Sequence, residues 1–368
     1  MFEFQRWIKV GLCTFLALGL TECRYGNGVA TLYGDVSVGD CASDTDIETI
    51  VCAADAFLDT LSTSDYSDAI IDWDDSEAKT IWTDDFDGDR NGLVLGDLKT
   101  KSVKAAVVLA RAVLSDQGFD DFIGVLAAED YIGETEDDDD YTSYSYAIGF
   151  IGEPSVSGEW MLQIGGHNMA YNITFLSGTA YPVPTFIGTE PTSKFYLKFD
   201  SNSYHPMDDK ADAMTDLFES LSSTALARAY LDDSYSDVLI GPDDGSAELP
   251  DDYPEDSDRE GILVSNLTST QQALVTAAIE QWVNDYAGDI ADDLLEEYTS
   301  ESAYEDTYIA WAGDEDDDAD LDEDGTYVRI DGPRLWIELI RLDADELSDE
   351  SQYHSVFRDK TMDYGNSL

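Results

Sequence analysis

The sequence predicts an α+β protein with a mixed or antiparallel sheet of about eight to ten strands, flanked by blocks of amphipathic helices. Two observations predict this class. Apolar residues recur at helical spacing before residue 116 and over residues 207–298, whereas the period changes to two from residue 144 and again from residue 307. Strands grouped in blocks beside grouped helices are typical of α+β domains rather than of repeated βαβ units. We expect residues 44–368 to form one large domain.

Four segments are expected to be helical. Residues 46–61 and 97–115 each place apolar side chains three and four positions apart, so that one face of each helix is apolar. Residues 207–231 and 269–298 show the same pattern. The acidic run 133–140 contains no such pattern and is expected to be a solvated loop.

Alternating apolar and polar residues, with glycine and proline between the runs, predict the strands. The expected strands form two groups, one in the middle of the chain and one near its C-terminal end: residues 144–151, 159–165, 167–176, 181–187 and 194–199, followed by 307–313, 326–330, 333–340 and 351–359.

The N-terminal residues predict export. Arg6 and Lys9 precede an apolar run over residues 10–20, which is too short to span a bilayer as a mature helix but fits a signal peptide. We expect residues 1–22 to be this signal and the mature chain to have no transmembrane segment. The protein would then be periplasmic, a cell-surface lipoprotein or secreted.

Two alternatives remain for the end of the signal. The tetrapeptide Leu-Thr-Glu-Cys, ending at Cys23, resembles a bacterial lipobox and would place a lipid on that cysteine. Gly-Val-Ala, ending at Ala30, would instead be an ordinary cleavage site. Residues 23–43 are expected to form an N-terminal arm. In an exported protein, Cys41 and Cys52 are expected to form a disulfide that ties this arm to the first helix.

The charge excludes one class of partner. The chain carries 80 Asp and Glu against 19 Lys and Arg, for a net charge of −61. Such a charge repels phosphate backbones, so the sequence predicts no nucleic-acid binding. It favours adaptation to high salt or seawater, with divalent cations as natural counterions. The sequence makes no prediction of oligomeric state.

Several motifs resemble a known family. "WMLQIGGHNMAYNITF", "PTFIGTEP", "YVRIDGPRLWIEL" and "YHSVFRDKTMDYG" look like the motifs of the family catalogued as domain of unknown function 3500, over roughly residues 50–368. The resemblance implies an exported protein and no particular activity. Members usually read Gly-Gly-His-His where this chain has Asn168 as the fourth residue. Asn168 is a poorer ligand for a transition metal than histidine.

Two of the three histidines fall within these motifs. His167 follows two glycines, and strand alternation places it at the end of an apolar face, where Gly166 would leave room for a ligand. His354 shares a strand face with Arg358. We expect the two imidazoles to line one pocket. In the competing interpretation, the same histidine and arginine side chains are structural and are satisfied by local hydrogen bonds and ion pairs.

Two functions remain open. The first is a hydrolase that uses His167, His354 and Arg358 as catalytic groups on a small anionic substrate. The second is a non-catalytic extracytoplasmic binding protein that holds a ligand in the same cleft and calcium in its acidic loops. The residues expected to contact the small molecule are Gln163, Gly166, Asn168, Glu190, Arg334, Asp363 and Tyr364.

An acidic loop is the candidate calcium site. Asp320, Asp322 and Asp324 take the first, third and fifth positions of a twelve-residue loop that ends at Asp331, with Gly325 at the sixth. This spacing resembles that of loops that wrap oxygen ligands around Ca²⁺. Ca²⁺ is the one cofactor that the sequence predicts.

Overall fold

The computed structural model describes residues 28, 36–198, 201–242, 253–254, 259–314 and 319–368. Its centre is a twelve-stranded mixed sheet, which confirms the predicted α+β class. The predicted signal peptide and most of the N-terminal arm lie outside the described residues. Within the described ranges, no helix is both long enough and apolar enough to cross a membrane.

The strands are ordered β1-β3-β4-β5-β7-β12-β11-β10-β9-β8, while β2 pairs with β3 and β6 with β5. All neighbours are antiparallel except β1 and β3. The strands are β1 (Ile70–Ile71), β2 (Leu93–Val94), β3 (Ala147–Ile151), β4 (Glu159–Gly166), β5 (Met169–Leu176), β6 (Thr179–Tyr181), β7 (Thr185–Thr189), β8 (Ile262–Leu263), β9 (Tyr308–Ala312), β10 (Tyr327–Asp331), β11 (Leu335–Asp343) and β12 (Ser351–Asp359).

In the sequence, five of the described helices precede β3 and the other five lie between β7 and β9. They are α1 (Asp46–Leu58), α2 (Thr63–Ala69), α3 (Ser76–Lys79), α4 (Thr100–Val113), α5 (Asp116–Glu136), α6 (Asp208–Glu219), α7 (Ser223–Ala229), α8 (Ser269–Val283), α9 (Gly288–Tyr298) and α10 (Glu301–Tyr304).

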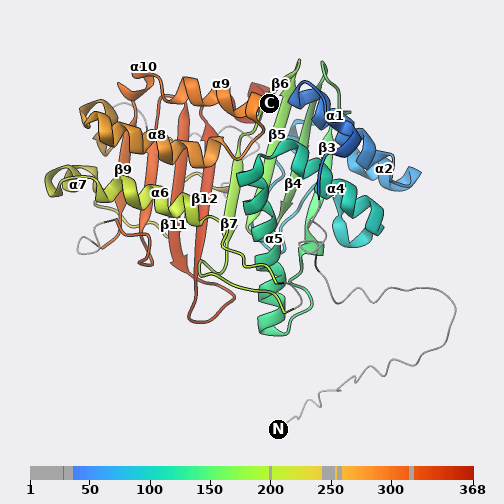
Figure 1. Ribbon diagram of the computed structural model, residues 1–368, viewed down its shortest axis with the longest axis horizontal. Helices are drawn as coiled ribbons and strands as arrows, with labels where there is room; N and C mark the ends of the chain where they lie inside the picture. Colours follow the sequence, from blue (N-terminus) through green and yellow to red (C-terminus); the bar gives the residue numbers. More distant parts are fainter. Residues whose placement is uncertain (1–27, 29–35, 199–200, 243–252, 255–258, 315–318) are drawn as a thin grey trace, which may run out of the picture.

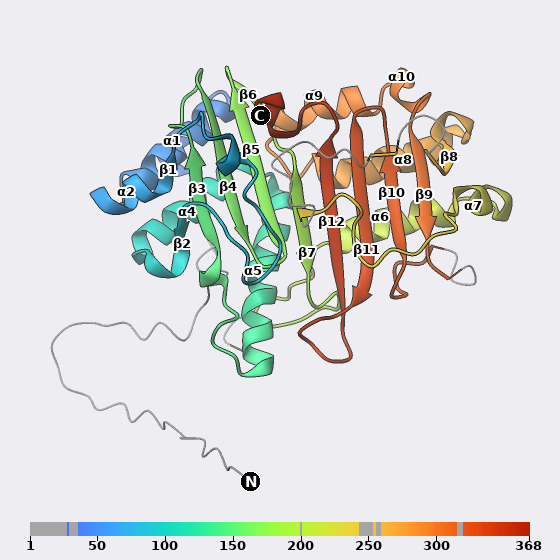
Figure 2. The ribbon, with the colours of Figure 1, turned by 180° about the vertical axis from the view of Figure 1, so that it is seen from behind.

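The two faces of the sheet are covered differently. The long helices α1, α4, α5, α6, α8 and α9 lie over one face, which we call the helix face (Figure 1). The opposite face, the loop face, is crossed by two segments that are irregular apart from the short helix α3 (Figure 2). The first covering segment, residues 72–92, lies over β3 to β5, and the second, residues 230–242, lies over the strands from β9 to β12.

The helix face contains most of the apolar core. Alternate residues of β5, Tyr171, Ile173 and Phe175, point to this face and are almost fully buried. Because a strand directs every second side chain to the same side, the alternation predicted from the sequence produces this apolar surface. Trp282 of α8 packs here and donates a hydrogen bond to Ser355 of β12.

The loop face combines a smaller apolar cluster with buried polar groups. Phe186, Trp336 and Val356 of the sheet pack against Leu231, Val238 and Ile240 of the second covering segment. Glu338 of β11, fully buried, accepts backbone hydrogen bonds from Leu239 and Ile240. The covering segment is therefore held to the sheet by polar bonds as well as by apolar contacts.

The structure corrects several predicted helix boundaries. A 21-residue helix, α5, was not predicted, and the acidic run expected to be a loop begins inside it. Residues 122–129 of α5 are all buried, so the apolar stripe that identifies a surface helix is absent. Ser115 caps its start. The expected helices 207–231 and 269–298 each divide into two, α6 and α7 in the first and α8 and α9 in the second.

The strand prediction is wrong at residues 194–199. Phe195 forms an isolated bridge with Tyr204 instead. The physical reason is that β7, the strand before this segment, already has β5 on one side and β12 on the other, so no free edge is available. The predicted strand 181–187 is also replaced by two strands, β6 and β7.

The predicted disulfide between Cys41 and Cys52 is present, with Cα atoms 5.4 Å apart. Cys52 lies in α1, so the bond ties the segment before this helix to the helix itself. The remaining long helices and strands lie close to their predicted positions, including α1, α4 and the four long C-terminal strands.

Candidate functional site

His167 does not lie in a strand, which corrects the sequence prediction. β4 and β5 form a hairpin whose end pair is Gly166 and Met169, so His167 and Asn168 are its two-residue turn. Asn168 has φ of 60°, a conformation that asparagine tolerates better than most residues. The turn carries His167 beyond the end of the strands rather than onto the apolar face.

The space beside Gly166 is filled by protein. A Cβ at this position would lie 2.4 Å from the ring of Tyr146, so only glycine lets the ring pack against the hairpin. The Tyr146 hydroxyl donates a hydrogen bond to the carbonyl oxygen of His167. The glycine therefore positions the histidine turn instead of leaving a gap for a ligand, contrary to the expectation for Gly166.

His167 is paired with a carboxylate of α5. Its Nδ1 lies 2.8 Å from Oε2 of Glu129, whose side chain is 2% exposed, while the histidine side chain is 12% exposed. Glu129 Oε1 makes no hydrogen bond in the described structure. The pair is a buried carboxylate holding an imidazole that still reaches the surface.

Two aromatic rings and further carboxylates surround the imidazole. Phe86 and Tyr141 each place a ring centroid 6.0 Å from that of His167. Burial by itself lowers the pKa of His167, but the hydrogen bond and charge of Glu129 outweigh it, with smaller contributions from Glu190 and Glu346, and raise that pKa above its ordinary value of 6.5. The site therefore favours the protonated imidazole.

Glu190 is engaged by the backbone. It is fully buried, follows β7, and accepts hydrogen bonds from the amides of Asp345, Glu346 and Leu347 in the β11–β12 hairpin. Burial raises the pKa of Glu190, although these amides oppose the shift. The side chain fastens the hairpin to the end of β7 beside His167.

His354 lies in the middle of β12 on the loop face. Its Nδ1 is 2.9 Å from Oδ1 of Asp237 in the second covering segment, and the ring packs edge-on against Phe186. Burial lowers the pKa of His354, but the hydrogen bond and charge of Asp237, together with the charge of Asp84, raise it above 6.5. His354 and His167 thus each have a carboxylate partner of their own.

Asn168 lies between the two histidine environments. Its Nδ2 is 3.5 Å from Nε2 of His167. A Cβ added to Gly188 would lie 3.0 Å from Oδ1 of Asn168 and 3.2 Å from Cδ2 of His354. The amide of Asn168 donates to the carbonyl oxygen of Asp84, and its carbonyl oxygen accepts from the amide of Gly188, so the turn is fastened on both sides.

The predicted arginines bind internal carboxylates. Arg358, 3% exposed, donates from Nε to Asp363 Oδ2 over 2.7 Å. Arg334 binds Asp359 and Glu297. The buried Tyr364 hydroxyl accepts a hydrogen bond from Trp82. These pairs hold the C-terminal residues and the first covering segment against the sheet.

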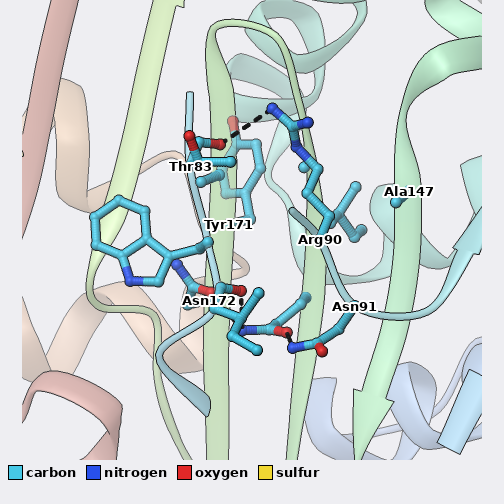
Figure 3. A pocket seen from close by; sticks show the side chains of 12 residues that line it. Thr83, Arg90, Asn91, Ala147, Tyr171 and Asn172 are labelled. Atoms are coloured by element: carbon cyan, nitrogen blue, oxygen red, sulfur yellow. Dashed lines mark hydrogen bonds between the residues drawn. The ribbon is translucent and has the colours of Figure 1, made fainter. Parts of the chain in front are cut away.

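Gln163 fastens the first covering segment to β4. Its side chain binds Asn91, Asn172 and the carbonyl oxygens of Lys79 and Ile81. Figure 3 shows the small pocket beside these amides, with Arg90 reaching the carbonyl oxygen of Thr83. Its cavity volume is about 20 Å³, which is room for about one water molecule.

The predicted calcium ligands are not all together. Asp320, Asp322 and Asp324 lie in the connection between β9 and β10, where Asp324 binds Nε of Arg341 over 2.9 Å. Asp331 lies at the opposite end of β10 and is bound by Arg259 and Lys360. Calcium binding by the three loop aspartates stays a prediction.

The sequence reasoning missed Glu129, Asp84 and Asp237. A carboxylate within the apolar run of α5 was a usable signal for Glu129, because Glu is rarely buried unless it is paired. Nothing distinguished Asp84 and Asp237 from the other acidic residues of irregular segments. Their importance comes from the fold, which brings them to one histidine.

The fold and the site define a class: an α+β protein whose single large sheet is covered by helices on one face and by irregular segments on the other. Residues 43–366 match the family model described as "Protein of unknown function (DUF3500)", and the chain belongs to this family. No curated protein and no solved structure matches the chain.

Proposed function

We propose that the protein is an exported hydrolase in which His167, held by Glu129, transfers the proton. The observation that supports this is the pairing of a 2% exposed carboxylate with an imidazole that reaches the surface. A carboxylate bound to one ring nitrogen fixes the tautomer and stabilises the imidazolium, while the other nitrogen is free to exchange a proton. The arrangement is that of a general acid–base pair.

The proposed reaction uses the neutral form of His167, which predominates only at a pH above its raised pKa. Nε2 of this neutral imidazole accepts a proton from water as the water oxygen attacks the substrate. Glu129 stabilises the imidazolium. When the bond between the substrate and its leaving group breaks, His167 donates the same proton to the leaving group and returns to its neutral form. Asn168 lies beside Nε2 and is placed to orient the attacking water or the substrate.

The proposed substrate is small and neutral or positively charged. Glu129, Glu190 and Glu346 place negative charge around His167, and this field disfavours an anionic substrate. Arg358, expected to bind an anion, is already paired with Asp363. Phe86 and Tyr141, whose ring centroids are 4.6 Å apart, together offer apolar surface on one side of the imidazole.

Export is part of the proposal. The cationic start and the apolar run over residues 10–20 have the pattern of a signal peptide. The disulfide between Cys41 and Cys52 supports the same conclusion, because such bonds persist in oxidising compartments.

The test is turnover of chromogenic neutral and cationic esters, amides and glycosides by the purified protein. We expect His167→Ala to lower kcat/KM for a turned-over substrate by about 10²-fold or more, and Glu129→Gln to lower it less. His205→Ala is the matched control, since His205 pairs with Asp208 at the exposed surface. No turnover by the wild type, or equal turnover by His167→Ala, would overturn the proposal and favour a non-catalytic binding protein.

A further inference from the structure

We propose that Asp84, Asp237 and His354 form a binding site for a divalent transition-metal ion, Zn²⁺ or Mn²⁺, on the loop face of the sheet. Each residue offers one ligand atom, and these three atoms lie within 4.8 Å of one another. The site is distinct from the His167–Glu129 pair, and the inference does not depend on the proposed hydrolase activity.

The three ligands come from three separate parts of the chain. Asp84 lies in the first covering segment, Asp237 in the second, and His354 in the middle of β12. Only the histidine is on a regular element, and its strand is paired on both sides, with β7 and β11. The two aspartates are therefore carried to a fixed imidazole by the two covering segments.

The geometry requires only a small adjustment to hold an ion. Zn²⁺ binds nitrogen and carboxylate oxygen at about 2.0–2.2 Å, so the ligand atoms of a tetrahedral site are roughly 3.4 Å apart. Nδ1 of His354 and Oδ1 of Asp237 are 2.9 Å apart and would separate by about 0.5 Å as the ion replaces their hydrogen bond. An approach by Asp84 of up to about 1.4 Å, from within 4.8 Å, would complete a three-residue set, leaving further positions for water.

The surroundings have the features of a built site. Gly188 faces His354 across the β7–β12 pair, and a Cβ there would lie 3.0 Å from Oδ1 of Asn168 and 3.2 Å from the imidazole. Glycine at this position leaves room for the Cδ2 edge of the imidazole, on the other side of the ring from Nδ1. Phe186 forms an apolar wall on the same side. A metal site with one imidazole and two carboxylates suits Zn²⁺ or Mn²⁺ better than Ca²⁺, which prefers oxygen ligands alone.

The ion would also have a mechanical effect. Because its ligands come from both covering segments and from the sheet, bound metal would join residues 72–92 and 230–242 to β12 at one point. It would offset the repulsion between Asp84 and Asp237, which face the same histidine in a chain of net charge −61.

Zn²⁺ titration of the chelator-treated full chain by calorimetry, in molar NaCl with excess Mg²⁺, tests the proposal. The salt and Mg²⁺ suppress diffuse binding to the acidic surface. We expect one saturable site per chain, with affinity lowered at least about tenfold in Asp84→Asn, Asp237→Asn and His354→Gln. The matched control is the double variant His205→Gln with Asp208→Asn, which removes an exposed histidine–carboxylate pair and should bind as the wild type does.

Hydrogen exchange supplies a second readout, and its first part uses the wild type alone. Zn²⁺ should slow exchange in both covering segments of the wild type, and Asp237→Asn should remove the protection in both. Absence of a saturable site, binding unchanged in all three ligand variants, equal displacement by Ca²⁺, or protection confined to one segment would overturn the proposal.

Discussion

The helix face and the loop face of the same sheet are stabilised by different interactions. On the helix face, residues such as Ile173 and Ile337 pack against helices, and no charge lies in the middle of the described strands. On the loop face, Glu338 and His354 lie in the middle of β11 and β12, Arg358 lies next to the end of β12, and all three are buried. Helices satisfy their own backbone groups, whereas irregular segments need polar partners from the sheet. A sheet covered by loops therefore carries polar groups that a sheet covered by helices does not need.

The largest effect is expected where a buried charge on the loop face loses its partner. Asp363→Ala would leave Arg358 buried without its carboxylate, because Asp363 is 0% exposed and accepts from Arg358 Nε. We expect a loss of about 3–5 kcal/mol in the free energy of unfolding, measured by urea titration. Ile337→Ala on the helix face should cost about 2–5 kcal/mol by cavity formation.

A surface variant provides the reference for this comparison. Asp116→Asn is the control for loss of a surface carboxylate, since Asp116 is 92% exposed beside Arg111, and it should cost less than about 1 kcal/mol. An Asp363→Ala variant as stable as Asp116→Asn would break the comparison between the two faces.

A smaller, pH-dependent effect is expected at the Glu129–His167 pair. The folded pKa of His167 is raised above its unfolded value, so its contribution to stability is fully present below about pH 6.5 and is lost as the pH rises through the folded pKa. Glu129→Gln should remove this contribution. The stability difference between wild type and variant should therefore be greater at pH 6 than at alkaline pH.

Unfolding titrations from pH 5.5 to 9 measure that difference, and the imidazole NMR signals of a chain with three histidines report the protonation directly. Asp208→Asn, beside the exposed His205, is the matched control. A wild-type-minus-variant difference that stays constant with pH would show that Glu129 acts on His167 through packing alone.

The smallest effect is expected at the acidic loop between β9 and β10. If Asp320 and Asp322 bind Ca²⁺, the ion should stabilise the fold by about 1.4 kcal/mol at ten times its Kd. Asp320→Asn with Asp322→Asn should abolish the increase in melting temperature while leaving the bond from Arg341 to Asp324 intact. Equal stabilisation of wild type and variant by Ca²⁺ would indicate diffuse screening of the acidic surface.

Periodicity predicted the elements that have one apolar side. α1, α4, β5 and β11 were found because their apolar residues repeat at the helical or strand spacing. α5 was missed because it is buried on nearly every side. The turn at His167 was missed because β5 begins two residues later than predicted, at Met169. Side chains of a strand alternate with a period of two, so the apolar residues of β5 lie on the same face whether the strand begins at His167 or at Met169.

The candidate site was predictable only in part. His167 and His354 stood out because histidine is rare in this chain. Their carboxylate partners are set by long-range contacts, between β12 and a segment over a hundred residues earlier in one case, which no local pattern contains. Asp84 and Asp237 could not be recognised from the sequence, because they are two among 80 Asp and Glu residues.

The sheet order has a consequence for how the chain is assembled. β7 is joined on one side to β5, which is close in sequence, and on the other side to β12, which comes near the C-terminal end of the sequence. During synthesis, β3 to β7 can therefore form a sheet that ends in an exposed edge at β7. That edge is a template for wrong pairing until β12 arrives. A chain of this topology avoids such mispairing if it stays unfolded, or bound to a chaperone, until its C-terminal strands have been synthesised.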